Sequence, residues 1–427
     1  MCTCGKLTEY IFMIELSKIR RSMGIFNLRK KKEIAATNAS PVTGFDYLRD
    51  NQIYFDGACQ SLRPQPVIDA LVEYYQKFNS CGERVKYQWG KITDQKVEET
   101  RELVLKYLKI KKKDYFVSFT LNTTYGINLI LSQFDPKKSQ IKTIVTSDIE
   151  HNSVFLATLT FSENHKLDRL VLSREADGSI PISEIPDNSL VVVNVVSNVD
   201  GRVLKNLSEL VSFVHQKHGY IVLDAAQAMA HNREILFNTE ADAVCFSAHK
   251  MYSASLGVMV VRKDFLEQIK SSFLGGGMVD DVKKSSYLLS SEHDDKKYTA
   301  FEAGLQAWGE IIALGAAIKW LEQLPESAKN QLEKCEEKLF DFLSTHSKIH
   351  CLNQGKSSTF SFYIDQVNSH LIAEALSDQG IMVRSGYFCV HYYLDHKLNL
   401  PPLVRVSLGY QTTESHINKL IGILKKF

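Results

Sequence analysis

Apolar runs alternate with segments of helical period from Phe45 onward. Six short runs, rich in Val, Ile and aromatic residues, predict strands at 115–119, 142–146, 190–196, 220–224, 243–247 and 257–261. Several of them lack polar alternation, which is typical of strands covered on both faces. Between the strands, residues 97–108 and 207–219 have helical period, and the second helix is expected to end at Gly219 as its C-cap glycine. The pattern predicts an α/β fold with a mostly parallel sheet between helices.

The pattern changes after Gly304. It predicts two long helices at 307–324 and 327–343, a strand at 358–364, and a final amphipathic helix at 414–424. One face of that last helix should carry Ile417, Leu420, Ile421 and Leu424. We therefore expect a domain change near residue 306: a large domain at 44–305, whose segment 44–63 is a candidate to pack on the other domain, and a smaller α+β domain at 306–427.

Residues 1–43 form a basic segment that ends in small polar residues. Its composition favours an N-terminal arm without regular structure, or an extension upstream of a start at Met23, over a targeting peptide. The apolar stretch "YIFMIEL" is too short, and too interrupted by Glu15, to cross a membrane.

Composition narrows the classes of partner. The 427 residues carry a formal charge of +2 with 23% charged residues, so there is no global attraction to nucleic acid or to acidic membranes, and we expect neither as a partner. The eight cysteines are scattered through a long chain, which favours a reducing, cytoplasmic compartment. No zinc-type spacing appears, and we expect no metal.

Candidate chemistry gathers just after the predicted strands, where Asp224, Ser247 and Lys250 stand. Alone, an aspartate there can cap a helix and a lysine can extend to solvent. A pyridine-aldehyde cofactor, however, needs several such groups together: an amine, a carboxylate for its ring nitrogen, a ring to stack on it, and donors for its phosphate. The chain offers such a set in order, in "TLNTTYGIN", "DIEHNS", "VVSNVDG", "VLDAAQA" and "SAHK".

These ordered motifs, from "IYFDGA" at Ile53 to "RVSLGY" and the last helix, resemble the class V aminotransferases of the fold type I pyridoxal-phosphate enzymes. Within that family the chain is most similar to the cysteine desulfurases and selenocysteine lyases. The resemblance implies the fold type I architecture, a large domain with a mostly parallel, seven-stranded type of sheet between helices and a smaller C-terminal α+β domain. The resemblance implies pyridoxal 5'-phosphate as cofactor, with Lys250 as the lysine that binds it covalently and Asp224 as the partner of its ring nitrogen. It further implies roles in stacking for His151, at the phenolic oxygen for Asn198 and Gln227, at the phosphate for Thr123, Thr124, Ser247 and His249, and at the substrate carboxylate for Arg405 and Arg384.

The reaction depends on "VRSGYFCVHYY" at 383–393. In the desulfurases the matching loop carries the cysteine that attacks substrate sulfur, and Cys389 takes that position. Arg384 and His391 would favour its thiolate; the alternative is that Cys389 is a small buried hydrophobe. The resemblance thus implies removal of sulfur from L-cysteine, giving L-alanine and a persulfide on Cys389, with a sulfur-acceptor protein as a further partner.

Departures from the desulfurase pattern keep other functions open. Leu305 stands where the family has a threonine that reaches the phosphate of the partner subunit, and "SAHK" replaces "SGHK". Another class V activity, such as that of an aminotransferase, selenocysteine lyase or epimerase-like enzyme, would keep Lys250 and Asp224 without a nucleophilic Cys389. A non-enzymatic protein that retains the fold is a third reading, which the complete residue set disfavours. We expect a homodimer with Phe301 to Gln306 near the partner's cofactor.

Overall fold

The computed structural model describes residues 15–18, 41–49, 51–82 and 85–427. The basic N-terminal arm expected at 1–43 lies largely outside these residues. The chain divides into two compact units. The larger comprises Gln60–Ser197 and Arg202–Gln323; the smaller joins the residues up to Cys59 to Asn198–Gly201 and Leu324–Phe427. Each unit is considered by itself.

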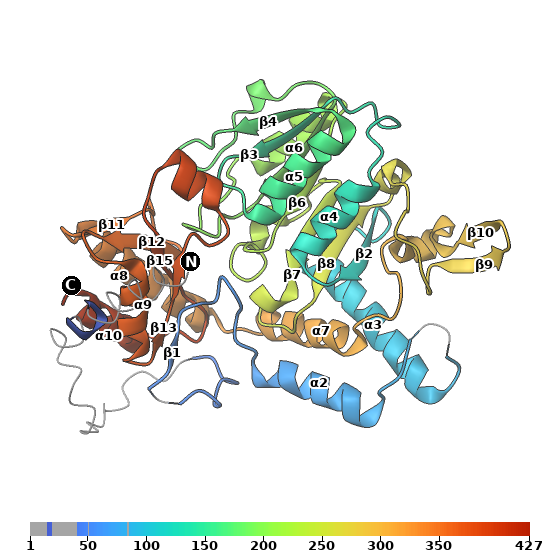
Figure 1. Cartoon of the computed structure of the whole chain (residues 1–427). Helices are drawn as coiled ribbons and strands as arrows, with labels where there is room; N and C mark the ends of the chain where they lie inside the picture. The colour runs from blue at the N-terminus through green and yellow to red at the C-terminus, as the bar shows by residue number, and fades with distance from the viewer. Residues whose placement is uncertain (1–14, 19–40, 50, 83–84) are drawn as a thin grey trace, which may run out of the picture. The chain divides into compact units, whose positions relative to one another are not determined.

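The larger unit is built on a seven-stranded sheet with the strand order β2-β8-β7-β6-β5-β3-β4 (Figure 1). Only β8 runs antiparallel to its neighbours β2 and β7, which confirms the α/β fold with a mostly parallel sheet. The strands are β2 (Tyr115–Thr120), β3 (Thr143–Ser147), β4 (Asp168–Leu172), β5 (Ser189–Asn194), β6 (Tyr220–Asp224), β7 (Ala243–Ser247) and β8 (Gly257–Arg262).

Six of these strands occupy the predicted runs, and their residues are almost completely buried. The prediction missed β4, which pairs only with β3 at the edge of the sheet. Its first residue is exposed and the next three are partly buried, so it lacks the apolar run that marked the central strands.

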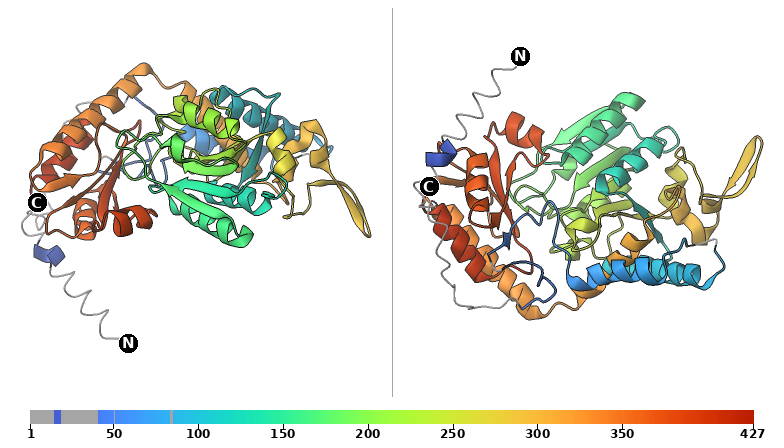
Figure 2. Two further views of the ribbon diagram at one scale, coloured as in Figure 1. Left: turned by 90° about the horizontal axis from the view of Figure 1, so that it is seen from above. Right: turned by 60° about the horizontal axis from the view of Figure 1, so that its bottom comes forward.

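Helices of the larger unit flank this sheet. Side chains of α4 (Thr123–Gln133) and α5 (Asn152–His165) form one core with the sheet, including Ile127, Ile130 and Phe161. The other helices are α2 (Gln65–Lys77), α3 (Gln88–Tyr107), α6 (Leu207–Gln216) and α7 (Trp308–Glu322). A hairpin of β9 (Val279–Lys283) and β10 (Ser286–Leu289) projects from this unit in both views of Figure 2.

The end of α6 differs from the expectation. The helix ends at Gln216, and the left-handed residue after it is His218 with φ 57°, not Gly219. Gly219 is needed for another reason, since a Cβ there would lie 2.5 Å from the Ser189 carbonyl oxygen. The glycine marks a close approach of two backbones rather than the cap itself.

The smaller unit is α+β. Its antiparallel sheet has the order β11-β12-β15-β14, and a short parallel pair joins β1 to β13. The elements are β1 (Ile53–Tyr54), α8 (Glu326–Thr345), β11 (Ile349–Cys351), β12 (Thr359–Ile364), α9 (Ser369–Ser377), β13 (Ile381–Met382), β14 (Arg384–Gly386), β15 (Leu403–Ser407) and α10 (Glu414–Leu424). In α10 the buried face contains Ile423 in place of the predicted Ile421.

Helix α7 belongs to the larger unit because it packs on α2 and α3. The compact units therefore change over at residue 324, whereas the sequence predicts a domain change near 306. As a statement about domains that fold independently, the prediction stays untested. Among the described residues, no helix is long and apolar enough to span a membrane, and no cluster of acidic, His and Cys side chains could hold a metal ion.

Candidate active site

The predicted site residues of the larger unit lie along one edge of its sheet. Strands β2, β3, β6 and β7 run in the same direction, so their carboxyl ends meet at that edge. Asp224 ends β6 and Ser247 ends β7, while α4 begins just after β2 and His151 follows β3. Ligands of open α/β sheets bind at this edge.

The N-terminus of α4 and the end of β7 form a polar cup. The Thr123 N–H donates to Ser247 Oγ at 2.9 Å, and the two hydroxyls lie 2.6 Å apart. Asn122 caps the helix by accepting the Tyr125 N–H at 2.9 Å. The positive end of the helix dipole makes such a cup suited to an anion such as phosphate.

His249 lies beside this cup in the chain, two residues after Ser247. Burial, with the charges of Lys250 and Arg63, lowers the pKa of its imidazole to about 4, so the ring is neutral near pH 7. Its Nδ1 is buried and has no hydrogen-bond partner among the described residues. A neutral ring with an unsatisfied nitrogen is suited to bind a group that the polypeptide does not itself supply.

Asp224 is the buried carboxyl of the site. Its side chain accepts the Ala226 N–H at 2.9 Å. Burial raises the pKa of this carboxyl, and the Ala226 N–H and the charge of Lys250 oppose the rise. An ionised Asp224 is therefore costly without a further cation, and a protonated pyridine nitrogen is a cation of that kind.

His151 is held by the start of α5. It is the N-cap residue of that helix, and its Nδ1 accepts the Ser153 N–H at 3.1 Å and also contacts the Ser153 hydroxyl. Because Nδ1 acts as an acceptor, the neutral ring carries its proton on Nε2. The ring orientation is thus set by the first turn of α5.

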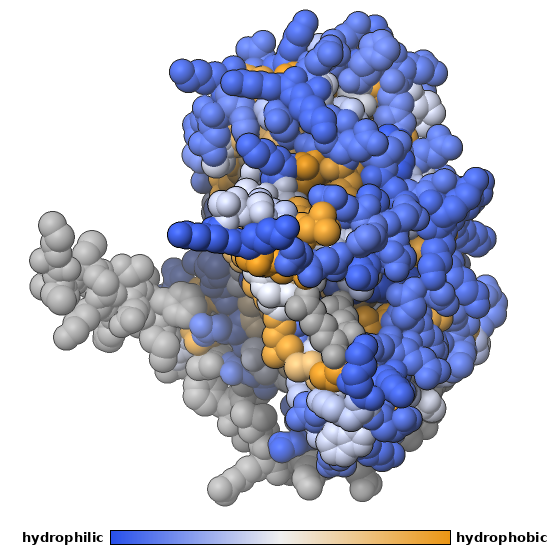
Figure 3. Space-filling model, turned by 90° about the vertical axis from the view of Figure 1, so that its right-hand side faces the viewer, coloured by the Kyte–Doolittle hydropathy of each residue, from blue (hydrophilic) through white to orange (hydrophobic). Residues whose placement is uncertain are grey.

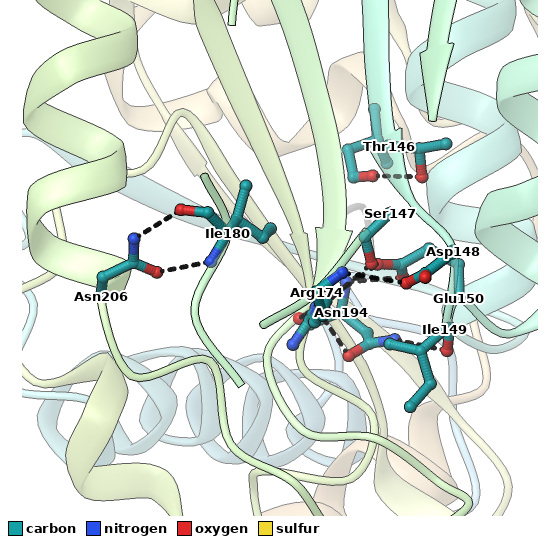
Figure 4. Close-up of polar contacts among 10 residues, drawn as sticks. Thr146, Ser147, Asp148, Ile149, Glu150, Arg174, Ile180, Asn194 and Asn206 are labelled. Carbon is teal, nitrogen blue, oxygen red and sulfur yellow. Dashed lines mark hydrogen bonds and ion pairs between the residues drawn. The ribbon is translucent and has the colours of Figure 1, made fainter. Parts of the chain in front are cut away.

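A buried ionic cluster precedes His151 and joins the ends of β3 and β5 (Figure 4). Glu150 accepts the Asn194 N–H at 2.7 Å, and Arg174 reaches both Glu150, at 3.4 Å, and the Asn194 side chain, at 3.0 Å. Burial raises the pKa of Glu150 to about 7, although Arg174, Ser147 and the Asn194 N–H lower it. Sequence reasoning missed this cluster, since its members are far apart in the chain.

Cys389 lies in the smaller unit, in the loop between β14 and the turn at Tyr392–Lys397. It is exposed, which excludes the reading of Cys389 as a buried hydrophobe. Phe388 and Cys389 have φ of 50° and 60°, a left-handed conformation that non-glycine residues adopt at a cost. The loop is held by the Asn198 side-chain amide, which donates to the Phe388 carbonyl at 2.8 Å.

Asn198 is therefore placed differently from the other predicted cofactor residues. It belongs to the smaller unit, and its amide nitrogen is already used by the cysteine loop. Its proposed contact with the phenolic oxygen remains a prediction, as does that of Gln227, which lies in the larger unit three residues after Asp224.

The two predicted carboxylate-binding arginines meet at Asp56. Arg405 is buried and donates to Asp56 Oδ1 at 3.2 Å and to the Asn198 carbonyl at 3.1 Å. The Arg384 guanidinium lies 3.8 Å from Asp56 Oδ2 and 2.7 Å from the Cys59 sulfur. The Arg405 Nε is buried without a partner among the described residues. Two arginines and one aspartate leave one net positive charge, which suits a single carboxylate; sequence reasoning gave Asp56 and Cys59 no role.

The chain is similar in sequence and fold to known proteins of one family. Residues 53–420 match the model of the class-V aminotransferase family. A probable cysteine desulfurase of Pyrococcus abyssi is 28% identical over 394 residues, which cover 89% of this chain and 95% of the relative. The apo structure of a cysteine desulfurase from Thermococcus onnurineus NA1 superposes with a TM-score of 0.78 at 26% identity, covering 88% of this chain and 94% of that one. The cysteine desulfurase CsdA from Escherichia coli, at 22% identity, shows the same fold with a TM-score of 0.78.

The chain belongs to the class-V aminotransferase family. It is a pyridoxal-phosphate-dependent enzyme, and the residues of the larger unit fit that cofactor. The cup at α4 fits the phosphate, the unsatisfied His249 Nδ1 fits a further polar contact, and the buried Asp224 fits the ring nitrogen.

Proposed function

We propose that the protein is a cysteine desulfurase that converts L-cysteine to L-alanine and leaves the sulfur on Cys389. The observation that carries this proposal is the exposed Cys389 on a loop held in a left-handed conformation. A thiol that attacks a substrate sulfur must be accessible, and the loop leaves Cys389 exposed. The proposal is supported by the relatives, which are named probable cysteine desulfurases.

In this proposal the larger unit holds the cofactor. Thr123, Thr124, Ser247 and His249 bind its phosphate, Asp224 its ring nitrogen, and His151 stacks on the ring. Bound pyridoxal phosphate supplies an electron sink for the Cα of the amino acid attached to it. Asp224 keeps the ring nitrogen protonated, and the positive charge there in turn stabilises its buried carboxylate.

Lys250 and Cys389 carry the proton and sulfur steps. The Lys250 amine, once it is free, takes the Cα proton of the substrate. The Cys389 thiolate then forms a bond to the substrate sulfur as the C–S bond of the substrate breaks. The electron pair of that bond stays on carbon, which takes a proton to complete alanine, and the sulfur remains on Cys389 as a persulfide.

Arg405 and Arg384 bind the substrate carboxylate in this proposal. Asp56 holds both guanidinium groups, so they are oriented before the substrate arrives. A guanidinium binds a carboxylate through two parallel hydrogen bonds, a geometry that lysine cannot provide. Beyond the site, we propose a cytoplasmic homodimer that passes its sulfur to an acceptor protein.

The first test concerns Lys250. Borohydride treatment of the holoenzyme should fix the cofactor on Lys250, identified by mass spectrometry of the labelled peptide. Lys250→Ala should still bind cofactor weakly through the cup but should not turn over. A label on another residue, or no visible absorbance after reconstitution, would contradict the cofactor assignment.

The second test concerns Cys389 and separates the desulfurase from another class V activity. Cys389→Ser should keep the bound cofactor and the exchange of the substrate Cα proton with solvent. It should lose alanine formation from L-cysteine by about three orders of magnitude or more, because a hydroxyl cannot form the persulfide. The wild-type peptide that carries Cys389 should gain one sulfur by mass. If the serine variant makes alanine as fast as wild type, the reaction is one that does not use Cys389.

A further inference from the structure

The lysine loop, residues 248–256 between β7 and β8, has a backbone conformation that its local sequence does not explain. Lys250 ends a single turn at Ala248–Lys250, and two residues later Tyr252 has φ 65° while its side chain is 1% exposed. A bulky residue with positive φ is strained, so neighbouring groups must hold its backbone in that conformation. The loop also lacks a glycine between Lys250 and Gly257 that would adopt this conformation freely.

That support comes from Ser61, a buried residue between β1 and α2. The Tyr252 N–H donates to Ser61 Oγ at 2.6 Å, and Ser61 Oγ donates to the His249 carbonyl at 3.0 Å. The Ser61 N–H donates to the same carbonyl at 2.9 Å. One serine therefore holds the residue before Lys250 and the second residue after it.

We propose that Ser61 is a positioning residue for Lys250. Its hydroxyl bridges the two sides of the lysine and fixes the direction in which the lysine side chain leaves the backbone. The proposal rests on the proposed role of Lys250, because it concerns the rate at which the Lys250 amine reacts with the cofactor aldehyde and the position from which it does so. A catalytic group that is misplaced by about 1 Å can lose about a hundred-fold in rate.

Removal of the hydroxyl has a local consequence. In Ser61→Ala the His249 carbonyl keeps the Ser61 N–H, but the bond from the Tyr252 N–H to the Ser61 hydroxyl is lost. Loss of a buried hydrogen bond is unfavourable, and the two sides of Lys250 are then no longer joined by the Ser61 hydroxyl, so the loop should shift and Lys250 should move with it. The neighbouring Ser253 offers a matched control: it is fully buried in the same loop, and its Oγ has no partner among the described residues.

The test measures covalent capture of the cofactor without turnover. Apo forms of wild type, Ser61→Ala and Ser253→Ala are mixed with pyridoxal phosphate, quenched with borohydride at intervals, and the labelled Lys250 peptide is quantified. We expect Ser61→Ala to be captured about ten- to a hundred-fold more slowly than wild type, and Ser253→Ala at the wild-type rate. In steady state, Ser61→Ala should lower kcat with L-cysteine while KM changes little.

Two further outcomes decide the proposal. If Ser61→Ala does not fold, Ser61→Cys tests the same bond, because a thiol is a weaker acceptor and should give an intermediate capture rate. The proposal is overturned if the Ser61 variants capture cofactor at the wild-type rate, or if Ser253→Ala is slowed as much as Ser61→Ala. Failure of the Lys250 assignment itself would appear separately, as a label on another residue of the wild-type protein.

Discussion

At the scale of single residues, burial sets the protonation of several groups near the lysine loop. His231 packs edge-on to the Tyr252 ring, with the ring centroids 6.3 Å apart, and burial lowers the pKa of its imidazole to about 4. Between about pH 4 and the ordinary imidazole value near 6.5, the unfolded chain binds this proton and the folded protein does not. Neutral His231 therefore does not reduce the free energy of unfolding above this pH range, and that free energy falls as the pH is lowered through the range.

This linkage gives a pH prediction. His231→Phe keeps an aromatic ring beside Tyr252 but cannot bind a proton. The free energy of unfolding should therefore fall less steeply on acidification in the variant, with a difference of at most about 3 kcal/mol between pH 7 and pH 4. Denaturant unfolding at a series of pH values measures it. If the free energy of unfolding falls equally with pH in wild type and variant, protonation of His231 does not cause the loss of stability in acid.

At the scale of elements, α4 couples helix capping to the proposed phosphate cup. Asn122 caps this helix, and Gly257 at the start of β8 leaves room for it, because a Cβ there would lie 2.5 Å from the Asn122 nitrogen. Asn122→Ala should cost about 1 kcal/mol of stability and should also weaken cofactor binding, because the amides at the helix start lose their fixed direction.

The chain contains a matched control for that prediction. Asn368 is also an N-cap residue, at α9 in the smaller unit, where its side chain accepts the His370 N–H at 2.9 Å. Asn368→Ala should cost a similar free energy of unfolding and leave the dissociation constant of pyridoxal phosphate unchanged. Fluorescence titration of both apo variants provides the comparison. If both variants bind pyridoxal phosphate with the same affinity, the Asn122 cap does not contribute to cofactor binding.

The elements also show what could be predicted from the pattern of residues. The central strands were predictable because strands buried on both faces need continuous apolar runs, as in "LVVV" of β5. Strand β4 lies at an edge of the sheet, and β9 and β10 form a largely exposed hairpin. None of these three strands needs a continuous apolar run, and none of them was predicted. The end of α6 was misjudged because Gly219 is required by the neighbouring strand rather than by the helix cap.

At the scale of the whole molecule, the predictable part of the site is the part that one sheet edge brings together. Asp224 and Ser247 end parallel strands and Lys250 follows the second of them, so strand direction alone implied that they share an edge. The Ser61 bond to His249 spans 188 positions, and the Arg174 bond to Asn194 joins the loop after β4 to the end of β5. No local pattern marks such contacts, and they became visible only with the fold.

Assembly is the remaining prediction at this scale. The larger unit exposes several large apolar side chains, and apolar residues appear among polar ones on the face shown in Figure 3. Leu305 is 76% exposed, and Val282 and Tyr287 of the β9–β10 hairpin are 65% and 55% exposed. Exposed apolar groups of this size favour burial against another protein, and a second copy of the chain is the partner that the family resemblance implies.

Light scattering on the holoenzyme should therefore give twice the chain mass of 48.4 kDa. Leu305→Asp should raise the dissociation constant of the dimer, because it would bury a charge in an apolar contact. Lys334→Asp is a charge-reversal control at an exposed position of α8 in the smaller unit, outside both the hairpin and the predicted contact at Phe301 to Gln306. If the predicted segment completes the partner's site, activity of Leu305→Asp should fall as its dimer dissociates on dilution. A wild-type monomer with full activity at the working concentration would contradict both the dimer and the shared site.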